Sequence, residues 1–282
     1  MTTETVTSTG GTVISYSVSP SLPAGLALDA STGAISGTPT AVTSSAVYTI
    51  TATNTGGTDT ASMTIVVNDV VPSNLAYSPN TFTLTKGTQM TSVSPTANGG
   101  TIISYSVSPS LPAGLALDTS TGTISGTPTA VTSSASYTIT ATNTGGNDTA
   151  TVTIVVNDIV PSISYGTTSY MLTKGTAMTT ATVTSTGGTV VSYSVSPSLP
   201  AGLSLDTSTG SISGTPTAVT PSASYTITAT NTGGTDTASV TIVVDDIAPS
   251  INYGTTSYTL TKGTAMTTAT VTSTGGTVVS YS

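Results

Sequence analysis

The sequence contains no cysteine, no histidine, no tryptophan and no arginine, and each absence removes a class of chemistry. Without cysteine, neither a disulfide framework nor a thiolate metal site can form. Without histidine, cysteine or arginine, the common nucleophile–base pairs of enzymes are missing. We therefore predict that the chain is not an enzyme and has no catalytic and no cofactor-binding residues.

Positive charge is also scarce. The 282 residues include only three lysines against 11 acidic residues, which gives a net charge of -8. Such a surface is repelled by phosphate backbones and by anionic lipid, which argues against nucleic-acid binding. No apolar run approaches the eighteen residues of a transmembrane helix, so we predict no membrane insertion in this segment.

Serine and threonine are abundant, at about two-fifths of the residues, and they alternate with apolar residues. A composition of this kind could indicate a disordered stalk, but the apolar residues are not scarce. Their period of two is the pattern of half-buried β-strands.

One stretch of twenty residues occurs three times with few changes. The sequence "SLPAGLALDASTGAISGTPT" begins at Ser21, and close variants begin at Ser110 and Ser198. The period is 88 residues, with one extra residue between Pro72 and Lys86. We predict four segments: residues 1–69 (a repeat lacking its first strands), 70–158 and 159–246 (complete repeats), and 247–282 (the N-terminal part of a further repeat).

The methionine at the start of the chain lies in register with methionines inside the repeats, namely Met90, Met178 and Met266. We therefore expect Met1 to be repeat-internal and the sequence to be a window of a longer array. Half-sandwiches at Met1–Val18 and Val271–Ser282 are expected to be ordered only where strands from the same chain or a neighbouring subunit complete them.

Strands can be assigned within one complete repeat by alternation, and turns by their glycines. The predicted strands are Ser162–Tyr165, Ser169–Thr173, Thr179–Ser185, Val190–Ser196, Leu203–Asp206, Gly210–Ser213, Ala223–Asn231 and Thr235–Val244. The predicted inward side chains are Val191, Tyr193, Val195, Tyr225, Ile227, Ala229, Ala238, Val240, Ile242 and Val244. We expect Tyr48, Tyr137 and Tyr225 to be buried with Ile50, Ile139 and Ile227, each tyrosine hydroxyl having a partner. Short strands separated by turns every eight to twelve residues predict an all-β fold of tandem immunoglobulin-like (cadherin-like) β-sandwiches, about 88 residues per repeat, without helix.

Two blocks together carry a family resemblance: "LPAGLSLDTSTGSISGTPT" and the following "YTITATNTGGTDTASVTIVV". They are similar to the bacterial Putative Ig domain family, a cadherin-like or dystroglycan-like sandwich, over all three repeats and both partial ends. The resemblance implies a tandem array in a secreted or cell-surface protein, often an adhesin, and brings no catalytic residues.

Each repeat has one lysine, at Lys86, Lys174 or Lys262 in "LTKGT". One interpretation is that it discourages pairing at a sheet edge. The alternative is an intramolecular isopeptide bond to Asn143 or Asn157, which would need a buried lysine beside a protonated carboxyl group.

The repeat junctions read "VVNDVVPS", "VVNDIVPS" and "VVDDIAPS", similar to cadherin linkers. Their acids, Asp69, Asp158, Asp245 and Asp246, are weak calcium candidates, because calcium needs six to eight oxygen ligands and each junction offers one or two carboxylates. We therefore predict solvated linker acids and no metal site. Asp29, Asp118 and Asp206 in "LD-x-S-T-G" are explained by Asx-turns.

A sugar-binding platform would need exposed aromatics, for which Tyr165, Tyr170, Tyr253 and Tyr258 are the candidates. Surface threonines could carry O-linked glycans, and Asn147 begins a lone N-glycosylation triplet.

We predict a structural array forming the stiff shaft of an extracellular filament or surface adhesin. The expected partners are neighbouring copies of the same protein, with glycans or host surface ligands as a further possibility. The alternative is a carbohydrate- or ligand-binding accessory module of a secreted enzyme.

Overall fold

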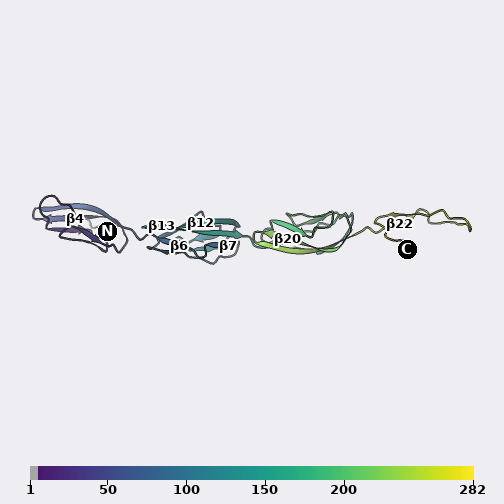
Figure 1. The fold of residues 1–282 in the computed structure, drawn as a ribbon, viewed down its shortest axis with the longest axis horizontal. Coiled ribbons are helices and arrows are strands. Elements are labelled where there is room, and N and C mark those ends of the chain that lie inside the picture. The colour runs from purple at the N-terminus through teal and green to yellow at the C-terminus, as the bar shows by residue number, and fades with distance from the viewer. Residues whose placement is uncertain (1–5) are drawn as a thin grey trace. The chain divides into compact units, whose positions relative to one another are not determined.

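The computed structural model describes residues 6–282, so the prediction for Met1 lies outside the described residues. The described chain is all-β, with tandem immunoglobulin-like sandwiches (Figure 1). It contains no helix, and therefore none long and apolar enough to cross a membrane. Two compact units can be described separately: Met1–Leu84 with Thr88–Val156, and Thr85–Gly87 with Asn157–Ser282.

The second repeat is a sandwich of one larger sheet and two short strand pairs. Its strands are β6 (Ser73–Ala76), β7 (Thr81–Thr85), β8 (Thr96–Asn98), β9 (Ser104–Ser108), β10 (Leu115–Leu117), β11 (Ile124–Gly126), β12 (Thr132–Asn143) and β13 (Gly146–Asn157). The larger sheet has the order β7-β13-β12-β9, and β6 pairs with β8 and β10 with β11.

The third repeat has the same arrangement, and all eight predicted strands exist. They are β14 (Pro161–Tyr165), β15 (Ser169–Thr173), β16 (Val183–Gly187), β17 (Ser192–Ser196), β18 (Leu203–Leu205), β19 (Ile212–Gly214), β20 (Thr220–Asn231) and β21 (Gly234–Asp245). The prediction was least accurate for β16, which begins four residues late. Before Val183 the chain passes β19 with a single bridge, Ala181 to Ile212, and pairs with β14 only afterwards.

Apolar residues of the two long strands form the core of each complete repeat. All six tyrosine and isoleucine side chains predicted to be buried are buried, with Ile139 and Ile227 fully enclosed. The prediction for Val191 is wrong, because this side chain is 72% exposed. Val191 precedes β17, so the alternation that buries Tyr193 does not extend to it.

The hydroxyl pairing predicted for the buried tyrosines does not occur at Tyr137 or Tyr225, which make no side-chain hydrogen bond within the described residues. No fully buried side-chain nitrogen or oxygen in residues 6–282 lacks a partner, so these hydroxyl oxygens still reach the surface. The paired hydroxyls belong instead to Tyr77, the residue after β6, and to Tyr165, the last residue of β14.

The first repeat has fewer strands, namely β1 (Ser15–Ser19), β2 (Leu26–Leu28), β3 (Ile35–Gly37), β4 (Thr43–Asn54) and β5 (Gly57–Val67). Its sheet has the order β1-β4-β5, so in the described part of the chain no strand pairs with the outer edge of β5. In the complete repeats this edge is covered by β7 or β15. Ile65 of β5 is accordingly only partly buried, whereas its counterpart Ile154 is fully buried.

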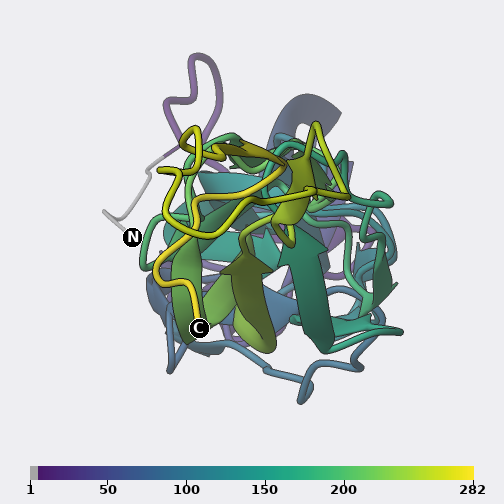
Figure 2. The same cartoon turned by 90° about the vertical axis from the view of Figure 1, so that its right-hand side faces the viewer.

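Residues 247–282 contain one strand pair, β22 (Ser250–Tyr253) with β23 (Val271–Thr274). Between them the yellow segment runs mostly as a thin tube (Figure 2). Residues 257–261, which correspond to β15, form no strand, and Tyr258 and Leu260 are exposed.

Candidate functional site

The polar cluster that we call the linker clasp fixes the start of the second repeat. It consists of Asp69, Asn143 and Thr144 with Gly100 and Gly145. The Asn143 side chain donates from Nδ2 to the Val70 carbonyl at 2.7 Å. The amide of Asp69 donates to Thr144 Oγ1 at 2.9 Å, and Asp69 Oδ2 accepts the amide of Thr101 at 2.8 Å. The linker is therefore bound to the repeat that follows it.

The third repeat carries the same clasp. Asn231 Nδ2 donates to the Ile159 carbonyl at 2.7 Å, and the amide of Asp158 donates to Thr232 Oγ1 at 2.9 Å. Asp158 Oδ2 accepts the amide of Thr189 at 3.1 Å. Because the same donors and acceptors are used, the clasp is a property of the repeat.

Glycine is required in the clasp because the linker lies directly on the backbone. A Cβ atom at Gly145 would overlap the carbonyl oxygen of Asp69, and one at Gly100 would overlap its carboxylate. Gly233 faces the carbonyl of Asp158 in the same way. The "Thr-Gly-Gly" turns are therefore binding surfaces for the linker as well as hairpin turns.

A second acid holds the first strand of each complete repeat. Asp148 Oδ2 accepts the amide of Leu75 at 2.8 Å, and Asp236 Oδ2 accepts the amide of Ile163 at 2.7 Å. The extra residue of the second repeat is accommodated here by Asn74, which has a φ of 55° and lies where the β6–β8 register shifts.

A tyrosine hydroxyl near the first strand of each complete repeat donates a hydrogen bond to a glycine carbonyl elsewhere in the same repeat. Tyr77 donates to the Gly122 carbonyl at 2.6 Å, and Tyr165 donates to the Gly210 carbonyl. Burial raises the pKa of both hydroxyls, that of Tyr165 to about 12 with a further contribution from Tyr193. Tyr165 was predicted to be exposed, which is wrong, because only 6% of the residue is accessible.

The linker acids are used differently from the prediction of solvated side chains. Asp158 is buried and Asp69 is partly buried, because both carboxylates accept backbone amides. Asp245 and Asp246 are exposed. Within the described residues, no group of three or more acidic side chains is placed to hold a metal ion.

The acids of "LD-x-S-T-G" form the predicted Asx-turns. Asp29 Oδ1 accepts the amide of Ser31 at 2.8 Å and its hydroxyl at 2.6 Å, and Asp118 binds Ser120 identically. The hydroxyl and amide donors lower the pKa of Asp29 and of Asp118 to about 2. Asp206 accepts the amide of Ser208 at 2.8 Å.

Lys86 and Lys174 each directly follow an edge strand, β7 or β15, which favours the first interpretation made for them, whereas no strand directly precedes Lys262. The amide of Lys86 donates to the Asn157 carbonyl, and its side chain, 42% exposed, lies 3.9 Å from Asp158 Oδ1. An isopeptide bond would need a buried lysine, and the Asn143 side chain is already engaged by the linker.

The remaining tyrosine candidates do not form a common platform. Tyr170 is partly buried against the core of the third repeat. Tyr253 and Tyr258 are exposed in residues 247–282, where they line a shallow hollow with Ile251 and Ala269.

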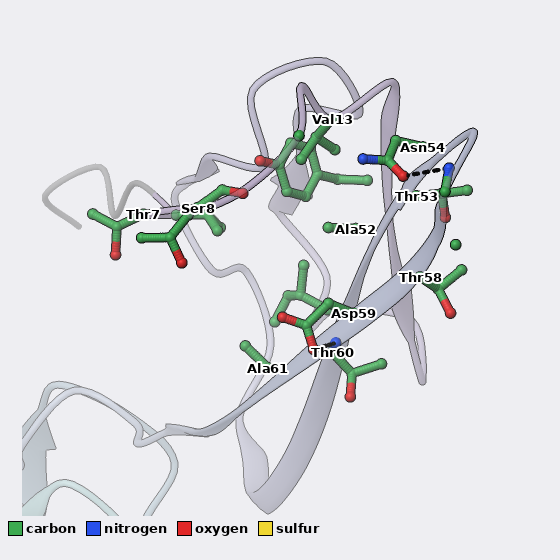
Figure 3. Close-up of a pocket in the computed structure, with 17 residues that line it drawn as sticks. Thr7, Ser8, Val13, Ala52, Thr53, Asn54, Thr58, Asp59, Thr60 and Ala61 are labelled. Atoms are coloured by element: carbon green, nitrogen blue, oxygen red, sulfur yellow. Dashed lines mark hydrogen bonds between the residues drawn. The ribbon is translucent and has the colours of Figure 1, made fainter.

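The first repeat has a cleft of about 400 Å³ at the position where the complete repeats hold their linker (Figure 3). Val13, Ala52 and Asn54 line it together with Asp59 and Ala61. Asn54 and Asp59 correspond by the repeat period to Asn143 and Asp148. By this correspondence, the cleft lies at the surface that binds the linker in the complete repeats.

Residues 6–282 thus show a class of protein defined by tandem immunoglobulin-like sandwiches, and in the two complete repeats backbone-directed polar groups hold the linker. The Putative Ig domain family (He_PIG) matches residues 1–68, 71–157 and 160–245, and the chain belongs to this family.

A stretch of 131 residues, 46% of this chain, is 32% identical to the "Serine-rich adhesin for platelets" of Staphylococcus aureus strain MRSA252 and covers 10% of that protein. The same stretch is 32% identical to the protein of that name in strain MSSA476, of which it covers 6%. The chain therefore spans only a small part of these relatives.

Among solved structures, Drosophila OTK extracellular domains 3–5 match with a TM-score of 0.41 at 18% identity, over 79% of this chain and 78% of that chain. The titin I-band fragment I67–I69 matches with a TM-score of 0.41 at 14% identity, over 82% of this chain and 88% of that one.

Proposed function

We propose that the chain is part of the load-bearing shaft of an extracellular filament or surface adhesin. The observation that carries this proposal is the pairing of β15 with β21. The two strands run parallel, with Ser169 opposite Thr241 and Thr173 opposite Asp245. One lies near the start of the repeat and the other at its end.

Parallel pairing of this kind resists tension along the chain. A force pulling the two ends of the repeat apart slides β15 and β21 along each other, so their hydrogen bonds are loaded together. The bonds include the one from the Lys174 amide to the Asp245 carbonyl at 2.9 Å. In a hairpin pulled from its open end, the bonds would instead break one after another.

The linker clasp supports the same role. It binds the linker to the following repeat through the Nδ2 groups of Asn143 and Asn231, whose Oδ1 atoms hold the local turn. A composition rich in serine and threonine and without cysteine suits a protein exposed outside the cell, and the similarity to the "Serine-rich adhesin for platelets" of Staphylococcus aureus supports that location. The role is structural and requires no catalytic residue.

Single-molecule force spectroscopy on the chain tests the proposal. We expect each complete repeat to unfold as a separate force peak, with a length gain of about 300 Å for 88 residues at the extended length per residue. Lys174→Pro removes one amide donor to β21 and should lower the peak of the third repeat alone. The second repeat is the internal reference. Extension at low force without peaks would refute a load-bearing role.

A further inference from the structure

Asn98 and Gly99 form an asparagine–glycine pair that the other repeats do not have. The second repeat reads "TANGG" at residues 96–100, where the third repeat reads "TSTGG" at residues 184–188. Nowhere else in the 282 residues does glycine directly follow an asparagine or an aspartate. Asparagine before glycine loses its side-chain amide most readily, because glycine has no Cβ to hinder the approach of its own nitrogen.

The groups that would react are accessible. Asn98 is exposed, and its side chain makes no hydrogen bond to another of residues 6–282. The Gly99 amide nitrogen, which is the nucleophile of the reaction, donates no backbone hydrogen bond within the same part of the chain. Neither group therefore has a hydrogen bond to give up before it reacts.

The strand that carries the pair is held less firmly than its counterpart in the third repeat. β8 ends at Asn98, and only two residue pairs join it to β6, with a shift of register between them. In the third repeat five residue pairs join β14 to β16, and Gly187, the counterpart of Gly99, is one of the paired residues. Ring closure needs a rotation of the backbone at the asparagine, which a continuous ladder of strand pairs opposes. The second repeat thus combines the reactive pair with the weaker ladder.

We propose that Asn98 is a site of spontaneous deamidation that releases the linker clasp of the second repeat. The nitrogen of Gly99 attacks the side-chain carbon Cγ of Asn98, and the new C–N bond closes a succinimide ring. The Cγ–Nδ2 bond breaks, and the side-chain nitrogen leaves as ammonia with the proton of the Gly99 amide. Water then opens the ring at either of its carbonyl groups. The products are aspartate and isoaspartate, and in isoaspartate the main chain passes through the former side chain.

Isoaspartate lengthens the main chain at a place where the clasp has no spare room. A Cβ at Gly99 would overlap the carbonyl oxygen of Val71, and one at Gly100 would overlap the carboxylate of Asp69. The glycine turn and the linker are therefore in direct contact. An additional main-chain atom at residue 98 pushes the turn away from the linker.

Two hydrogen bonds of the clasp come directly after the modified residue. The Gly100 amide donates to the Val70 carbonyl at 2.9 Å, and the Thr101 amide donates to Asp69 Oδ2 at 2.8 Å. Displacement of the turn breaks both bonds, and either product adds a negative charge beside a turn that already holds the Asp69 carboxylate. The loss of two such bonds corresponds to about a tenfold increase in local opening.

Ageing of the purified chain in buffer at neutral to mildly alkaline pH tests the site. Peptide mass spectrometry with electron-transfer fragmentation should show Asn98 converted to aspartate and isoaspartate. Asn98→Thr, which introduces the residue of the third repeat, should abolish the conversion. Thr186→Asn creates the same pair in the firmer ladder and should convert several-fold more slowly. An Asn98 that stays intact while a free peptide of residues 91–105 converts completely would overturn the site.

Hydrogen–deuterium exchange of the aged chain tests the consequence for the clasp. Peptides covering residues 69–75 should exchange about tenfold faster once isoaspartate has formed, while peptides covering residues 158–165 stay unchanged. Asn98→Asp supplies the charge without the longer main chain, so the fresh variant should show a smaller increase. Conversion at Asn98 without faster exchange at residues 69–75 would overturn the release of the clasp. The inference goes beyond the shaft role, which is tested on fresh protein and so succeeds or fails separately.

Discussion

Replacement of Asn231 by alanine should loosen the start of the third repeat. The side chain is buried and makes three hydrogen bonds: Nδ2 to the Ile159 carbonyl at 2.7 Å, and Oδ1 from the amides of Gly233 at 2.8 Å and Gly234 at 3.2 Å. Each bond contributes about 0.5–1.5 kcal/mol, and a carbonyl left buried without a partner costs about 1–3 kcal/mol. We expect the free energy of local unfolding at the start of the third repeat to fall by about 2–4 kcal/mol.

Asn54→Ala is the matched variant, because in the first repeat the same side chain makes only the turn bond to Gly56 within the described residues. Its expected cost is about 1 kcal/mol. The difference between the two variants contains the linker bond together with the bond from Gly234, which has no counterpart in the first repeat within the described residues.

Hydrogen–deuterium exchange read by mass spectrometry measures the opening directly. Peptides covering residues 158–165 should exchange faster in Asn231→Ala, while peptides from the second repeat stay unchanged. Equal effects of Asn231→Ala and Asn54→Ala on their own repeats would show that the linker bond contributes nothing.

Three further predictions concern the core, titration and metal. Ile227→Ala should lower the free energy of unfolding of the third repeat, measured by chemical denaturation, by about 2–5 kcal/mol, because the side chain is fully enclosed. Ile50→Ala should lower that of the incomplete first repeat by less. The raised pKa of Tyr165 stabilises the fold below its unfolded value of about 10, and this contribution should be lost between about pH 10 and 12; Tyr165→Phe should reduce the pH dependence of the third repeat, to which Tyr170 still contributes, and an unchanged pH profile would contradict it. Removal of calcium with a chelator should leave the melting temperature unchanged, because Asp69 and Asp158 accept backbone amides; a clear decrease would restore them as ligands.

The sandwich could be predicted because each strand repeats a period-two pattern with strong turn residues. The bounds of β15 were predicted to the residue, since Ser169–Thr173 alternates cleanly between glycine-containing turns. The prediction failed where pairing is interrupted. Thr179–Thr182 alternates as a strand does, but only one bridge is available to it.

The clasp was missed because its residues also have ordinary local explanations. Asn143 and Asn231 stand before "Thr-Gly-Gly", where a turn accounts for all three residues. Asp69 and Asp158 stand in a linker, where an acidic residue is normally explained by its exposure to solvent. The partners of these side chains lie far away in the sequence, 73 residues for Asn143 and Val70 and 32 residues for Asp69 and Thr101. The one available signal was that asparagine, two glycines and the linker aspartate recur together in both complete repeats.

Every clasp binds a segment that precedes its own repeat, and this fixes an order of events during synthesis. When Asn231 emerges, Ile159 has already been made, so the third repeat can close without waiting for anything downstream. Domains made from the N-terminus can therefore finish one at a time, each on the linker behind it. Almost identical neighbours otherwise invite exchange of strands between unfinished repeats. A chain that completes each repeat before the next is available reduces the time during which such exchange can occur.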